Sequence, residues 1–197
     1  MDDDKTQQSW ERFLNPTILR SNLIIGSLYI AAFEMLKSSI IERIRDFYTT
    51  GFNQSGLTIS EKYKTEVLSL NSSPLYASLQ WLQNMEIISK NDVNEFEEIK
   101  KCRNEIAHEF INFLSTSPTI DPLPLFPRTI ALLSKIEKWW IVNVEIPTDP
   151  DLVGSDVGEN SVIPGPIMTL QLLTDIALGS EEESKQYYKF MKEKGSI

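Results

Sequence analysis

The most informative part of the sequence is Lys101-Cys102-Arg103-Asn104-Glu105-Ile106-Ala107-His108-Glu109-Phe110. Apolar residues recur every three or four positions through and around it, at Val93, Phe96, Ile99, Cys102, Ile106, Phe110 and Phe113. This spacing is typical of an amphipathic α-helix with one buried stripe. We expect the helix to start with Asp92 or Asn91 as its N-cap and to end before Pro118, within Leu114 to Ser117.

The same stretch holds the only histidine of the chain, five positions after an arginine. At about 100° per residue, His108 is expected on the face opposite the apolar stripe, with Asn104 one turn before it. Arg103 is expected at the flank of the stripe. Glu105 and Glu109 are expected to face solvent and receive no role. Spacing alone fits ordinary solvated surface residues better than a site.

A resemblance favours the site. Arg103-Asn104-x-x-Ala107-His108, at the centre of a helix in a short helical chain, resembles the R-x(4–6)-H motif of the HEPN superfamily. The resemblance implies an all-α, HEPN-like helical bundle that acts as a metal-independent endoribonuclease, often a toxin or effector in prokaryotic toxin–antitoxin and phage-defence systems. It also implies a homodimer whose two motifs share a cleft. One subgroup, paired with small nucleotidyltransferases, carries a tyrosine where this chain has Phe110.

The chemistry can also be argued from the residues. Cleaving RNA without a metal needs a base for the 2′-hydroxyl proton, an acid for the leaving 5′-oxygen and a cation at the phosphate. An imidazole can serve as base or acid, and a guanidinium binds two phosphate oxygens. Because one chain offers one imidazole, a two-histidine mechanism requires a second copy. We predict His108, Arg103 and Asn104 as catalytic residues.

Charge bears on the substrate. The net charge of −9 argues against bulk electrostatic binding of nucleic acid. Lys100, Lys101 and Arg103 nevertheless form a small basic cluster, which is either an RNA-binding pocket, with Lys100 and Lys101 on the substrate, or an ordinary solvated patch. One cysteine and one histidine exclude a His/Cys metal cluster, and neither a metal ion nor a cofactor is expected.

The rest of the chain predicts a helical bundle over residues 1–146, a linker or long loop over 147–166, and a C-terminal helical appendage over 167–197 that packs on the bundle or on a partner. With 41% hydrophobic residues, the 197-residue chain can bury a proper core. Helices are expected at 6–14, 17–50, 59–70, 74–87, 128–144, 167–178 and 180–194, with a loop at 51–58 and an extended crossover at 115–127.

The stretch Leu23–Leu36 is apolar but spans only 14 residues and contains Glu34, whereas a membrane span needs about 20. We therefore expect no membrane segment and a cytoplasmic protein. Glu34 itself sits among apolar neighbours and calls for a partner, for which Arg103 and a surface lysine are candidates, or for contact with solvent.

The sequence thus favours a dimeric metal-independent endoribonuclease whose partners are RNA and an antitoxin or defence-complex protein. The competing hypothesis is a non-catalytic HEPN-like dimeric binding or scaffold subunit of such a complex. A third, weaker one is a helical adaptor that carries the motif by chance.

Overall fold

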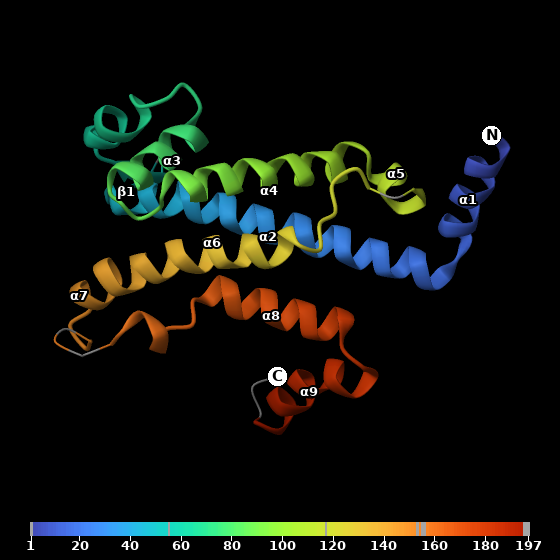
Figure 1. Ribbon diagram of the computed structural model, residues 1–197. Helices are drawn as coiled ribbons and strands as arrows, with labels where there is room; N and C mark the ends of the chain where they lie inside the picture. Colours follow the sequence, from blue (N-terminus) through green and yellow to red (C-terminus); the bar gives the residue numbers. More distant parts are fainter. Residues whose placement is uncertain (1, 55, 117, 153, 155–156, 195–197) are drawn as a thin grey trace.

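The all-α prediction is confirmed by the computed structural model, which describes residues 2–54, 56–116, 118–152, 154 and 157–194 (Figure 1). The elements are α1 (Asp2–Leu14), α2 (Pro16–Phe47), β1 (Thr49–Asn53), β2 (Gly56–Ile59), the π-helical turn η1 (Tyr63–Leu68), α3 (Pro74–Asn84), α4 (Lys90–His108), α5 (Phe110–Ser115), α6 (Leu125–Trp140), the π-helical turn η2 (Ile141–Glu145), α7 (Ile146–Thr148), the 3-10 turn η3 (Glu159–Ser161), α8 (Gly165–Leu178) and α9 (Glu181–Glu193).

The 32-residue helix α2 is the centre of the bundle. The side chain of Asn15 accepts hydrogen bonds from the backbone N–H groups of Thr17 and Ile18, and Pro16 occupies the first helical position, where no N–H is needed. From there α2 contacts α3, α4, α5, α6 and α8. Figure 1 shows α4 and α8 on opposite sides of the layer formed by α2 and α6. The motif helix and the C-terminal helices therefore present separate surfaces.

Aromatic side chains fill much of the core. Phe33 of α2 stacks on Phe96 of α4, with ring centroids 5.9 Å apart. Trp81 of α3 and Trp140 of α6 stack in parallel at 6.0 Å, and both are buried. Such pairs add about 0.5–1.5 kcal/mol beyond the area they bury. Trp81 and Trp140 are therefore packing residues.

The segment after α2 was predicted wrongly as a helix end followed by a loop. It forms an antiparallel hairpin in which Phe52 pairs with Leu57 and Asn53 with Gly56. Gly56 has φ +113°, a conformation that glycine adopts without a steric penalty. The β-branched residues on both sides favour extended backbone, and the strands are too short for their alternation to stand out. The helix expected at 59–70 shrinks to η1.

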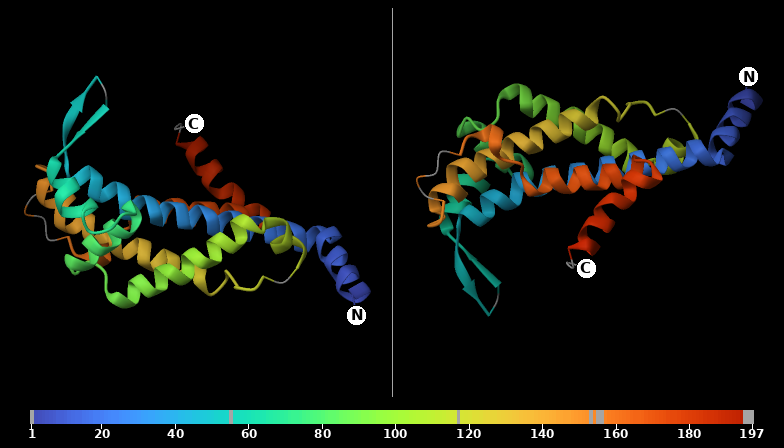
Figure 2. Two further views of the ribbon diagram at one scale, coloured as in Figure 1. Left: turned by 90° about the horizontal axis from the view of Figure 1, so that it is seen from above. Right: turned by 90° about the horizontal axis from the view of Figure 1, so that it is seen from below.

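The C-terminal region is helical where the sequence predicted it. One side of α8 packs against α2 and α6 and buries Leu170. Ser180 then caps α9: its hydroxyl accepts from the Glu183 N–H, and the Glu183 carboxylate accepts from the Ser180 N–H. Figure 2 shows α9 leaving the end of α8 and running away from the bundle.

Two helical stretches, Pro16–Phe47 and Glu159–Leu178, are long and apolar enough to cross a membrane when judged by length and composition alone. The apolar window of the first is 39% buried in the structure and that of the second 11%. The expectation of no membrane segment rested on Leu23–Leu36 and did not consider the second stretch. The stretch that contains α8 is thus the more exposed of the two apolar stretches.

Candidate functional site

Helix α4 carries all of the predicted site residues. Its N-cap is Ser89 rather than Asp92 or Asn91: the Ser89 hydroxyl accepts from the Asp92 N–H, and the Asp92 carboxylate accepts from the Ser89 N–H. Asp92 thus fills the third helical position of a capping box. Lys135 of α6 also binds the Asp92 carboxylate at 2.6 Å, which fixes the start of α4 on the bundle.

The helix ends at His108, so the prediction of one helix continuing past Leu114 is wrong. Glu109 leaves the helical region, with φ −119° and ψ 37°, and α5 begins at the next residue. Just after this break, the rings of Phe110 and Phe113 lie against the bare backbone of Gly26 in α2. A Cβ atom at Gly26 would come within 2.9 Å of the Phe113 ring. His108 therefore sits at a helix end beside a bend, not in mid-helix.

Arg103 lies half-buried at the flank of α4, as predicted, and its guanidinium is engaged on two edges. Nη2 donates to Glu34 Oε1 at 2.5 Å, and Nη1 donates to Asn104 Oδ1 at 3.2 Å. The group also lies over the Phe33 ring, 5.2 Å from its centroid, at a distance typical of a cation–π contact. These contacts fix the guanidinium next to α2.

Glu34 of α2 is the residue that holds Arg103. Its carboxylate also accepts from Lys37 Nζ at 3.3 Å, and its side chain remains 41% exposed. Burial would raise the pKa of Glu34, but the hydrogen bonds from Arg103 and Lys37 outweigh it and hold the pKa below its usual value. All three possibilities weighed for Glu34 are thus met together: an arginine partner, a lysine partner and contact with solvent.

His108 is exposed and points away from the apolar stripe of α4. No hydrogen bond or ion pair joins it to Arg103 among the residues that the structure describes. Five residues along a helix place the two about 140° apart around the axis and about 7.5 Å apart along it. Asn104 lies between them, bonded to Arg103 and one turn before His108. One copy of α4 thus does not bring the imidazole to the guanidinium.

The lysines of the predicted basic cluster have different surroundings. Lys100 donates a hydrogen bond to the Tyr76 hydroxyl and lies 4.5 Å from the centre of the Tyr76 ring. Lys101 is exposed. With Glu97, Glu98 and Asn104 the two lysines line an open depression of about 390 Å³. Acidic and basic groups are therefore mixed on this face, and the lysines do not form a purely basic groove.

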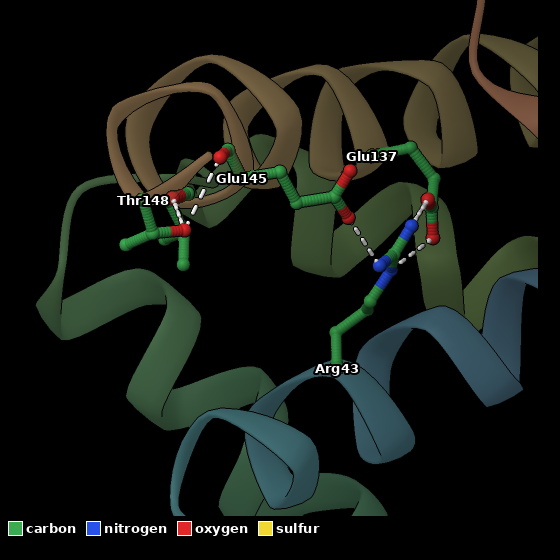
Figure 3. Close-up of polar contacts among 5 residues, drawn as sticks. Arg43, Glu137, Glu145 and Thr148 are labelled. Atoms are coloured by element: carbon green, nitrogen blue, oxygen red, sulfur yellow. Dashed lines mark hydrogen bonds and ion pairs between the residues drawn. The ribbon is translucent and has the colours of Figure 1, made fainter. Parts of the chain in front are cut away.

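A polar cluster that the sequence argument did not single out joins α2 to α6 and η2. Figure 3 shows Arg43 of α2 binding two carboxylates: Glu137, whose side chain is only 2% exposed, at 2.5 Å, and Glu145 at 2.6 Å. The sequence does carry a signal, because Glu137 follows Leu133 and Ile136 at helical spacing on the buried stripe of α6. A carboxylate there requires a partner from another helix.

Glu105 also has a structural role that was missed. It was expected to face solvent, but its carboxylate accepts from the backbone N–H groups of Thr119 and Ile120, at 2.7 and 3.3 Å. The crossover between α5 and α6 is thereby tied to α4. The local sequence does not predict this contact, because Glu105 binds backbone groups of an irregular segment.

Within the part of the chain that the structure describes, no three His, Cys, Asp or Glu side chains come together in a way that could hold a metal ion. The buried Cys102 lies in the core among apolar side chains, as the stripe predicted. What the site offers chemically is one exposed imidazole, one restrained guanidinium and one amide, all on the same helix. Neither a family model, nor a curated protein, nor a solved structure matches the chain.

Proposed function

We propose that this chain is a HEPN-type helical bundle that cleaves RNA without a metal ion, in a composite site formed by two copies of α4. The observation that carries the proposal is the exposed position of His108 on α4, with Asn104 half-buried one turn before it and Arg103 held at the flank by Glu34. An exposed histidine on a helix face is available to a two-fold partner, whereas a histidine in the core is not.

In the proposed reaction, His108 of one copy takes the proton from the 2′-hydroxyl, whose oxygen attacks the phosphorus. The bond from phosphorus to the 5′-oxygen breaks, and His108 of the other copy protonates that oxygen. The products are a 2′,3′-cyclic phosphate and a free 5′-hydroxyl. Arg103 stabilises the negative charge on the phosphate oxygens.

Glu34 restrains this reaction as well as supporting it. The carboxylate positions Arg103, but it occupies the Nη2 edge that a phosphate would otherwise bind. RNA must therefore compete with Glu34 or bind the edge now shared with Asn104. Lys37 favours the exchange, because it can keep a hydrogen bond to the Glu34 carboxylate after Arg103 has turned to the phosphate.

The test is cleavage of a labelled RNA in excess EDTA by the wild type, His108→Ala and Arg103→Ala. We expect a loss of about 10²–10⁴-fold for His108→Ala, the usual contribution of an acid–base residue. Arg128→Ala is the matched control, because it removes ion pairs from α6 to Glu95 and Glu98 of α4 without touching the motif. Equal cleavage by all variants, or inhibition by EDTA alone, would overturn the proposal.

A second candidate function is a non-catalytic, dimeric HEPN-like binding subunit of a defence or toxin–antitoxin complex. The ion pair between Arg103 and Glu34 favours it, because it leaves the cation neutralised, and so does the net charge of −9. This hypothesis predicts that the wild type and His108→Ala both leave RNA intact, and that a partner protein elutes with each of them to the same extent.

A further inference from the structure

Helix α8 carries apolar residues on every side, together with Thr169, Gln171, Thr174 and Asp175, yet only one side of it packs on the bundle. Leu170 faces the bundle and is buried. Met168 and Ile176, which lie away from Leu170 around the helix, are 55% and 49% exposed, and Leu173, about 60° from Leu170, is 40% exposed. A helix that is apolar on all sides is normally buried on all sides. The outer face of α8 therefore lacks a covering element in the single chain.

Helix α9 cannot supply that cover in its own chain. None of its residues is buried, and Tyr188, Phe190 and Met191 expose their side chains. The turn before it is held by a hydrogen bond from the Tyr187 hydroxyl to Asp175 and by the close approach of Gly179 to the Asp175 carbonyl, where a Cβ would come within 2.2 Å. This turn directs α9 away from the bundle (Figure 2).

Apolar exposure is concentrated on these two helices. Of the 18 large hydrophobic side chains that are exposed in the described residues, 7 lie on α8 and α9: Met168, Leu173, Ile176, Leu178, Tyr188, Phe190 and Met191. Such a concentration of exposed apolar side chains is typical of an interaction surface. We call α8, Gly179, Ser180 and α9 the C-terminal elbow.

The charges of α9 indicate which partner covers this apolar surface. Its first turn is acidic, with Glu181, Glu182 and Glu183, of which Glu181 pairs with Lys185 of the same helix. Its second half carries Lys189, Lys192 and one acid, Glu193, and the basic Lys194 follows as the C-cap. A two-fold axis across the helix would place two copies of α9 antiparallel, with the acidic end of each beside the basic end of the other. The helix dipoles would then be opposed as well, which is favourable.

We propose that the C-terminal elbow is a self-association surface, on which a second copy of this chain places its α9 antiparallel to α9 and over the outer face of α8. The contact is isologous, so each copy covers the apolar surface of the other. An anionic bilayer is the less suitable occupant, because it would meet the acidic first turn of α9 and a chain with a net charge of −9. The inference does not depend on the proposed nuclease.

The first test compares the mass of the full chain in sedimentation equilibrium with that of Ile176→Glu. Ile176 is half-exposed in the single chain, so the substitution leaves folding intact but buries two charges in the dimer. We expect the dissociation constant of this contact to rise about 100-fold and the mass at micromolar concentration to halve. Phe52→Glu, which changes the exposed tip of the hairpin, is the matched control and should leave the mass unchanged.

The second test exchanges charges. Lys189→Glu with Lys192→Glu makes both ends of α9 acidic, and Glu181→Lys with Glu182→Lys makes both basic, while Glu183 of the capping box is kept. We expect each double variant to lose self-association and a 1:1 mixture of the two to restore it. His108→Ala should not change these masses, which separates this contact from the one proposed at α4.

Three results would overturn the inference. The first is a wild-type mass that Ile176→Glu does not lower. The second is a mixture of the charge variants that associates no better than either alone. The third is a wild type that is monomeric at 100 μM, on the order of concentrations used in such work, and that floats with phosphatidylserine vesicles through α8; the elbow would then be a membrane-binding element.

Discussion

Replacing Arg43 with alanine should destabilise the fold strongly, although the arginine side chain is itself one-third exposed. Arg43 donates from Nε and Nη2 to both carboxylate oxygens of Glu137, which is almost completely buried in α6. Without the arginine, that carboxylate remains buried with no opposite charge beside it. Breaking a buried pair in this way costs about 3–5 kcal/mol. We expect about 3 kcal/mol, because water can enter where the exposed part of Arg43 was.

Urea denaturation followed by circular dichroism measures this loss. With a slope of about 1–3 kcal/mol/M, a loss of about 3 kcal/mol lowers the midpoint by roughly 1–3 M urea. Lys64→Ala is the control, because it removes only the exposed ion pair between Lys64 of η1 and Glu61, and it should cost at most about 1 kcal/mol. Replacing the buried pair as a whole, with Arg43→Met and Glu137→Leu together, should recover most of the stability. An Arg43→Ala midpoint equal to that of Lys64→Ala would refute the reasoning.

Three further predictions concern packing, pH and reactivity. Gly26→Ala should cost about 1–3 kcal/mol and lower the melting temperature, because its Cβ would press on the Phe113 ring at 2.9 Å. Burial would raise the pKa of Asp92, but the hydrogen bonds that its carboxylate accepts from Lys135 and Ser89 hold the pKa below its ordinary value. The stability that Asp92 contributes is therefore present above about pH 4 and is lost as the pH falls through the pKa of the folded state. Asp92→Asn should flatten the acid limb of a curve of stability against pH. Burial raises the pKa of Cys102 to about 11, so at pH 8 a thiol reagent should modify it only at the rate at which the protein opens.

The elements predicted correctly are those specified by nearby residues. Pro74 at the first helical position marks the start of α3. Ser180 followed by Glu183 marks the start of α9, because the two halves of a capping box lie within three residues of each other. The start of α4 was placed a little late because Asp92 was taken as the cap, whereas it is the reciprocal partner of Ser89. Even there the error is only a few residues.

The elements predicted incorrectly depend on distant contacts. The apolar spacing of Ile106, Phe110 and Phe113 runs unbroken through the bend at Glu109, so no pattern in α4 reveals that the helix ends at His108. Beside the bend, two phenylalanine rings pack on Gly26, which lies more than 80 residues earlier in the chain.

The same distinction applies to the candidate site. Periodicity placed Arg103 at the flank and His108 on the outer face, because both positions follow from the angle per residue alone. It could only suggest which group would meet Arg103, and the structure gives that place to Glu34, 69 residues away. The residues that a second copy would contribute cannot be predicted from the helical periodicity of one chain.

The measurement that tests the composite site most directly is a subunit-mixing titration. A fixed total concentration of protein is made from wild type and His108→Ala in varying proportions, equilibrated, and assayed for RNA cleavage in EDTA. Because the two-histidine mechanism needs an imidazole from each copy, the rate should fall as the square of the wild-type fraction. A rate that falls linearly with that fraction, or a wild type that does not cleave RNA, would contradict the shared site.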